Sequence, residues 1–179
     1  MNGIVVNIIP GEKICELGGG SDPLFCRLRA PPGSAWHNVD IRPLPCVDIV
    51  ADLESHLPIE DRTYDFIFSK YSIEHIGWRN VKSHISEMYR ILNPGGRVLV
   101  ITANLYEQCK KIASSSEWDE NFSGMVFGGQ DFGENAHKVG FSPEYISKLF
   151  ADAGFVDIHV VPLPECITDM ILQARKGVA

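Results

Sequence analysis

Short apolar runs alternate with longer mixed segments along most of this 179-residue chain, and glycines and prolines mark the boundaries between them. Runs of this kind predict buried β-strands, and the mixed segments between them predict helices. We expect seven strands, over residues 13–17, 36–39, 47–51, 64–69, 97–102, 155–161 and 170–174. The alternation predicts a three-layer α/β sandwich, with one mostly parallel sheet covered on both faces. The length suits a single domain over residues 1–179.

Three helices are expected between these strands. The first begins near Ser21 or Asp22, with Pro23 in its first turn, where the missing N–H costs nothing. The second spans residues 80–92, because its apolar residues recur at helical spacing. The third spans residues 142–153 and also carries an apolar face.

The segment 103–140, between the fifth strand and the last helix, is rich in glycine, serine and acidic residues. Long irregular segments in compact domains are often lids or disordered stretches. Its glycines, aromatic side chains and polar groups suit an adaptable cover. We therefore expect an irregular substrate lid here, away from the adenosine of a bound cofactor.

Composition limits the classes of partner. A net charge of −7 disfavours nucleic acid, which attracts fields of basic residues. The five cysteines form no C-x-x-C pair, which indicates small core residues in a reducing compartment and no structural zinc or other metal. No run approaches the roughly 20 apolar residues of a membrane span. The first ten residues lack a basic region and a cleavage site, so a cytoplasmic protein is expected.

Polar and glycine residues follow four strands of the predicted sheet. Ligands of open α/β sheets bind beyond these carboxyl ends, where the strand order reverses. The glycines of 18–20 allow the backbone to pass close to a ligand, and Asp40 can accept hydrogen bonds from both hydroxyls of a ribose. Asp52 is placed to accept from an adenine amino group, and Ser69 closes the fourth strand. The pattern predicts an adenosine-containing cofactor.

The residues at these strand ends resemble the motifs of the class I S-adenosylmethionine-dependent methyltransferases. The segment 16–20, Glu-Leu-Gly-Gly-Gly, is similar to their first motif, an acidic residue followed by G-x-G. Asp40 with Ile41 matches the ribose-binding acid and its apolar neighbour, and Asp52-Leu53 matches the motif at the adenine edge.

Later segments continue the resemblance over nearly the whole chain. Residues 64–76, which include Glu74-His75, look like the family's "fDvi…lEHi" segment, and residues 92–97 match its "LkPGG" turn. Phe141-Ser142 and Ala153-Gly154-Phe155 match its late region. One position departs from the family's first motif, because Asp22 occupies the place where the family often has a third glycine.

The resemblance implies a Rossmann-like fold whose last strand is antiparallel to the others. It also implies a methyltransferase that uses S-adenosyl-L-methionine and releases S-adenosyl-L-homocysteine. The family's acidic residue serves the amino group of the cofactor, a role that would fall to Glu16. The residues predicted to bind the cofactor are Glu16, Gly18, Gly19, Gly20, Asp40, Ile41, Asp52, Leu53 and Ser69.

Methyl transfer needs alignment of acceptor and methyl group, and a base only where the acceptor is a hydroxyl or a protonated amine. The candidate bases are His75 and His137, and for each a structural role remains open. Residues 128–141 resemble a group of small bacterial methyltransferases that are associated with surface-polysaccharide biosynthesis. That resemblance implies a small-molecule or glycan acceptor with a sugar hydroxyl.

Two other functions fit parts of the pattern. A dinucleotide-binding dehydrogenase would need G-x-G-x-x-G, but Pro23 occupies the place of the third glycine, where a proline ring prevents close packing of helix and strand. A methyltransferase-like protein that binds the cofactor without catalysis is the other alternative. The sequence does not distinguish oligomeric states.

Overall fold

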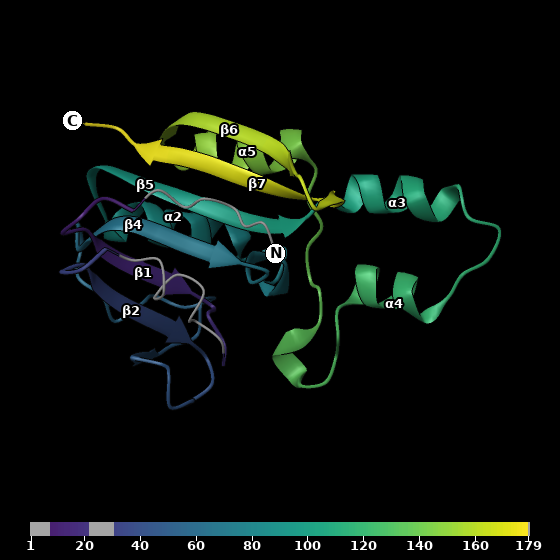
Figure 1. Ribbon diagram of the computed structural model, residues 1–179, viewed down its shortest axis with the longest axis horizontal. Coiled ribbons are helices and arrows are strands. Elements are labelled where there is room, and N and C mark those ends of the chain that lie inside the picture. Colours follow the sequence, from purple (N-terminus) through teal and green to yellow (C-terminus); the bar gives the residue numbers. More distant parts are fainter. Residues whose placement is uncertain (1–7, 22–30, 179) are drawn as a thin grey trace.

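The computed structural model describes residues 8–21 and 31–178 (Figure 1). Seven strands form one sheet: β1 (Lys13–Leu17), β2 (Ala35–Asp40), β3 (Ile49–Val50), β4 (Tyr64–Lys70), β5 (Leu92–Ala103), β6 (Phe155–Leu163) and β7 (Cys166–Lys176). Their order is β3-β2-β1-β4-β5-β7-β6, and β7 alone runs antiparallel to its neighbours. The prediction of a Rossmann-like, seven-stranded sheet with an antiparallel last strand is confirmed.

Several strand boundaries differ from the predicted ones. β5 begins at Leu92 rather than at Arg97. Leu92 pairs with Tyr64 of β4, and the segment 93–96, which we expected to be a turn, continues the strand. β3 is limited to Ile49–Val50 at the edge of the sheet, where it has one neighbour. β6 and β7 are longer than expected, since they pair as a hairpin as far as Leu163 and Cys166.

Two helices cover one face of the sheet, α2 (Val81–Ile91) and α5 (Pro143–Asp152), and Figure 1 shows both behind the strands. The hydroxyl of Ser142 caps α5 by accepting a hydrogen bond from Tyr145 N at 3.2 Å. Successive strand residues point to opposite faces, so β1, β4, β5 and β7 each contribute to two apolar clusters. The cluster under the helices contains Cys15, Leu17, Ile67, Val98, Ile85, Met88, Leu149 and Phe150, and the other contains Ile14, Phe66, Phe68, Leu99 and Ile101.

The first predicted helix, with Asp22 and Pro23, lies outside the described residues. The prediction of an irregular segment over 103–140 is wrong for its first part. This part forms α3 (Leu105–Ala113) and α4 (Glu120–Phe127), which extend beyond the carboxyl end of β5 (Figure 1). Asp119 caps α4 by accepting from Phe122 N at 2.9 Å. None of the helices in the described part of the chain is long and apolar enough to span a membrane.

A lysine of the last strand caps the end of α2. Lys176 is only 9% exposed, and its Nζ donates to the carbonyl oxygens of Tyr89 at 2.7 Å and Leu92 at 2.8 Å. The last carbonyls of a helix have no partner within the helix, and a cation is favourable there. This contact joins a strand at one side of the sheet to the helix that covers its centre.

We expect Lys176→Met to lower the free energy of unfolding by about 2 kcal/mol, because hydrogen bonds to charged groups contribute about 1.5–3 kcal/mol. Thermal unfolding followed by circular dichroism measures the change. Lys148→Met is the matched control, since Lys148 is exposed and pairs with Asp152 of its own helix. The free energy of unfolding of that variant should fall by about 0.5 kcal/mol or less. Equal losses in the two variants would contradict the role of Lys176 as a cap of α2.

Candidate functional site

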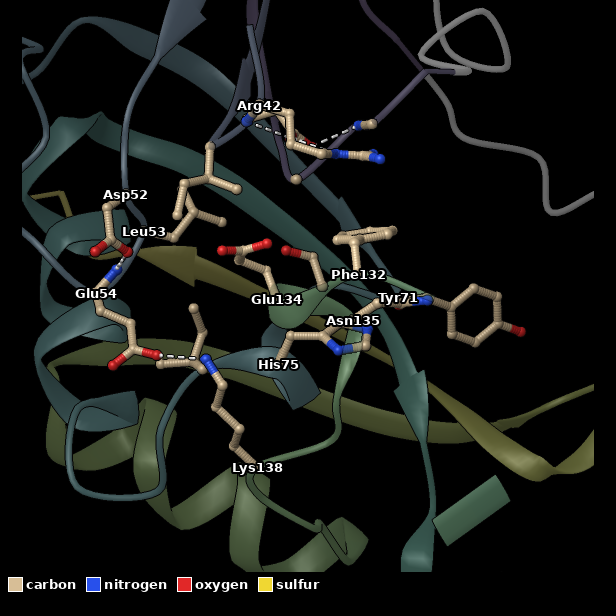
Figure 2. A pocket seen from close by; sticks show the side chains of 16 residues that line it. Arg42, Asp52, Leu53, Glu54, Tyr71, His75, Phe132, Glu134, Asn135 and Lys138 are labelled. Atoms are coloured by element: carbon tan, nitrogen blue, oxygen red, sulfur yellow. Dashed lines mark hydrogen bonds and ion pairs between the residues drawn. The ribbon is translucent and has the colours of Figure 1, made fainter. Parts of the chain in front are cut away.

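The carboxyl ends of β1, β2 and β4 open on one pocket of about 200 Å³ (Figure 2). It lies where the strand order reverses, because β2 and β4 lie on opposite sides of β1. Six of the residues predicted to bind the cofactor line this pocket, namely Gly18, Gly20, Asp40, Ile41, Asp52 and Leu53. The fold thus gathers predicted residues from separate segments of the chain around a single space.

The glycines that follow β1 are required by the protein's own packing. Gly18 and Gly20 have φ angles of +72° and +59°, in the left-handed region that favours glycine. A Cβ on Gly18 would collide with the side chain of Ser72, and a Cβ on Gly19 would collide with that of Asn38. The backbone of this turn can therefore pass beside Ser72 and Asn38 only while positions 18 and 19 carry no side chain.

Asp40 ties the end of β2 to the glycine turn. Its Oδ2 accepts a hydrogen bond from Gly20 N at 2.9 Å, and its Oδ1 accepts from Arg42 N at 2.9 Å. The residue is 7% exposed and faces the pocket. Each carboxylate oxygen can accept more than one hydrogen bond, so this carboxylate can still receive hydroxyl donors from a ligand.

Apolar side chains form two walls of the same pocket. Ile41 is 39% exposed at the end of β2, and Leu53 follows β3. Phe132 faces them from the insertion, with the guanidinium of Arg42 lying 4.2 Å from the centre of its ring. Sequence reasoning missed Arg42 and Phe132; the only signal was that Arg42 comes two residues after the strand-end aspartate.

Three predicted residues do not line the pocket. Glu16 and Ser69 are buried at the ends of β1 and β4, with exposures of 4% and 0%. The Oγ of Ser69 has no hydrogen-bond partner within residues 8–21 and 31–178. Gly19 lies between Glu16 and Asn38, because a Cβ on it would meet both side chains. Glu16, Gly19 and Ser69 therefore lie at the strand ends beside the pocket but not in its lining.

The later part of the insertion, residues 128–140, closes the other side of the pocket, and we call it the cover segment. Lys138 reaches across to Glu54, with Nζ 3.2 Å from Oε1, as Figure 2 shows. Hydrogen bonds, first of all from Asn80, hold the pKa of the Glu54 carboxyl below its usual value. The cover segment was expected to stay away from the cofactor site, but Phe132, Asn135 and Lys138 line the pocket of the predicted cofactor residues.

The two candidate bases lie next to each other. The ring centres of His75 and His137 are 5.0 Å apart. Burial lowers the pKa of both rings, so both are neutral at pH 7. Nδ1 of His75 lies 3.1 Å from the carbonyl oxygen of Ala136, and since a carbonyl only accepts, Nδ1 carries the proton.

The histidines belong to different spaces. His75 lines the first pocket, whereas His137 lines a second cavity of about 200 Å³ beneath the cover segment. The side chains of Glu74 and Gln108 also line this second cavity. Sequence reasoning missed Gln108, because a single glutamine in a polar segment carries no signal of burial.

Comparison with known proteins decides between the families considered above. The family model described as the methyltransferase domain matches residues 6–160. A ubiquinone/menaquinone biosynthesis C-methyltransferase of Burkholderia mallei is 26% identical over 123 residues, which cover 59% of this chain and 49% of that protein. The chain spans about half the length of the curated relatives it matches.

Solved structures show the same fold. A SAM-dependent methyltransferase from Aquifex aeolicus has a TM-score of 0.64 at 15% identity, over 97% of this chain and 85% of that one. Phosphoethanolamine N-methyltransferase 2 of Haemonchus contortus, solved with S-adenosylhomocysteine, has a TM-score of 0.67 at 16% identity, over 96% of this chain and 50% of that one. The chain therefore belongs to the methyltransferase-domain family of class I, S-adenosylmethionine-dependent methyltransferases.

Proposed function

We propose that this protein transfers a methyl group from S-adenosylmethionine to a hydroxyl group of a small-molecule or glycan acceptor, a sugar in the simplest case. The observation that carries the proposal is the convergence of Gly18, Gly20, Asp40 and Leu53 on one pocket at the reversal point of the sheet. Family membership supports the methyl donor.

The residues around the first pocket fit this cofactor. Asp40 would accept the ribose hydroxyls, and Ile41 and Leu53 would cover the adenine with Asp52 at its edge. The buried hydroxyl of Ser69, which lacks a partner among the described residues, suits the methionine end. Glu16 would serve the amino group. When bound, S-adenosylmethionine supplies a methyl group activated on a sulfonium.

The chain's own contribution is to align the reacting groups and to exclude water. The cover segment is held over the pocket by the ion pair of Lys138 with Glu54 and by the contact of Phe132 with Arg42. It is also joined to the loop after β4, since Lys138 N donates to the carbonyl oxygen of Glu74 at 2.8 Å. These contacts would keep bulk water from the reacting atoms.

His137 would accept the proton that the acceptor hydroxyl loses. A hydroxyl is a poor nucleophile, and a positioned base contributes typically about 10²–10⁴-fold. Both rings are neutral and both hydrogen-bond to the backbone, His75 to Ala136 and His137 to Met125 and Val126. Position favours His137 as the base, because it borders the second cavity whereas His75 lines the first pocket.

A carbon acceptor is the second candidate, because the curated relative named above is a C-methyltransferase. The polar lining of the second cavity, Glu74 and Gln108, favours an acceptor with O–H or N–H groups instead.

Asp40→Asn should weaken binding of S-adenosylhomocysteine by at least about tenfold, because a charge-assisted hydrogen bond contributes about 1.5–3 kcal/mol and an amide accepts through one oxygen only. Isothermal titration calorimetry measures the affinity, and circular dichroism checks that the variant folds. Asp152→Asn, on the exposed side of α5, is the control and should bind as the wild type does. Binding of NAD with no binding of S-adenosylhomocysteine would overturn the cofactor assignment.

His137→Gln should reduce kcat by at least about 100-fold while the affinity for S-adenosylhomocysteine stays unchanged. The rate is measured with an acceptor that the wild type methylates, found in a panel of sugars and glycolipids. His75→Gln is the comparison variant, and it should lower kcat by less than His137→Gln does, because His75 lines the first pocket rather than the second cavity. Full turnover in His137→Gln would remove this residue from the mechanism.

A further inference from the structure

A second cavity lies beyond the first pocket, between the 3₁₀ turn η1 (Ile73–His75), the helices α3 and α4, and the cover segment. Its volume of about 200 Å³ equals the liquid volume of about six or seven water molecules. It therefore admits one small group rather than a chain of several sugars. The two spaces share Lys138 in their walls, and the pair of His75 and His137 lies between them.

Two buried side-chain acceptors line this cavity. Gln108 of α3 is 4% exposed, and its Oε1 has no hydrogen-bond partner in the described part of the chain. Glu74 is 2% exposed, and its Oε2 accepts a hydrogen bond from the hydroxyl of Thr102 at 3.0 Å. Buried polar atoms are nearly always paired in folded proteins, so an unpaired amide oxygen on a cavity wall points to a ligand that donates to it.

The charges around the cavity exclude an anion. Lys138 is the only lysine or arginine among the described residues in its wall, and its ammonium group pairs with Glu54. Asp169 of β7 and Tyr71, which follows β4, bond to each other at 2.7 Å and lie near Glu74, and both histidines are neutral. Burial raises the pKa of Glu74 to about 7, so the carboxyl is ionised in a large part of the molecules at neutral pH.

We propose that this second cavity is the acceptor site, and that it selects a sugar-like group that carries hydroxyl or amino groups but no carboxylate or phosphate. The proposal rests on the proposed function. The O–H and N–H groups of the bound sugar-like group would donate hydrogen bonds to Oε1 of Gln108 and to the carboxylate of Glu74. Leu105 and Phe127 would contact its apolar side. His137 borders the same cavity and is in place to take the proton of the hydroxyl that is methylated.

Titration of the ¹⁵N-labelled full chain, without and with S-adenosylhomocysteine, tests this selectivity. The probes are methyl β-glucoside and methyl β-glucuronide, which have similar size but differ in one carboxylate. We expect saturable shifts of the Gln108 side-chain amide and of the amides around the cavity with the glucoside, and at least about tenfold weaker binding of the glucuronide, a difference of about 1.4 kcal/mol.

Variants distinguish the cavity from other binding places. Gln108→Leu and Glu74→Gln should weaken glucoside binding by at least tenfold, while Gln173→Leu, a change at an exposed position of β7, leaves it unchanged. S-adenosylhomocysteine should still bind to all three variants. Gln108→Leu should fold at least as stably as the wild type, because it removes a buried oxygen that has no partner among the residues the structure describes.

A pH series tests the role of Glu74 without any acceptor. Its pKa is about 7 in the folded chain and about 4.5 when unfolded, so the folded state binds more protons between these values and stability falls as the pH rises. Glu74→Gln removes this effect. The melting temperature of the variant relative to the wild type should therefore increase between pH 5 and pH 8, and a constant difference would exclude Glu74 as the buried titrating group.

Two results would overturn the proposal: equal binding of glucoside and glucuronide at the cavity, or no shift of cavity residues with either probe. Failure of the proposed function looks different, since it appears as loss of S-adenosylhomocysteine binding in the wild type.

Discussion

The parallel pairing of β1 with both β2 and β4 is the contact on which the rest of the structure depends. It sends the carboxyl ends of three strands to one edge of the sheet, and it makes this edge the point where the strand order reverses. The glycine turn, Asp40 and the loop that carries Glu74 and His75 meet there for this reason.

Much of the fold and of the first pocket could be predicted from the sequence. β1 is an apolar run followed by Gly18, and β2 ends in Asp40, and both features are visible in the sequence. The glycine turn also has a local cause, since Ser72 and Asn38 leave no space for a Cβ. Pattern and packing agree at these positions, which is why the sequence predicts the glycine turn and its place at the pocket.

The parts that the sequence did not predict depend on contacts between distant segments. The helices of the insertion are only nine and eight residues long and lie in a segment rich in glycine, serine and acidic residues, although Asn104 and Asp119 cap their starts. Gln108 and Lys176 look like ordinary surface residues in the sequence. Their burial follows from the packing of α3 near β7 and from the end of α2, neither of which a local pattern contains.

Several polar groups that are costly to bury lie at or beside the two cavities. Ser69, Glu74 and Gln108 are each less than 5% exposed, and Ser69 and Gln108 have side-chain oxygens without a partner in residues 8–21 and 31–178. A stable core would place apolar side chains at such positions, because an unpaired buried oxygen costs about 1–3 kcal/mol. Their presence beside the strand ends is consistent with a site where ligands complete the hydrogen bonding.

The central claim is that the strand-end pocket holds the methyl donor with its sulfur directed at the second cavity. A crystal structure of the protein with S-adenosylhomocysteine tests this most directly. We expect the ribose hydroxyls within hydrogen-bond distance of the Asp40 carboxylate and the sulfur facing the pair of His75 and His137. Adenosine bound away from Asp40, or a sulfur that points away from the cavity of Glu74 and Gln108, would contradict the account.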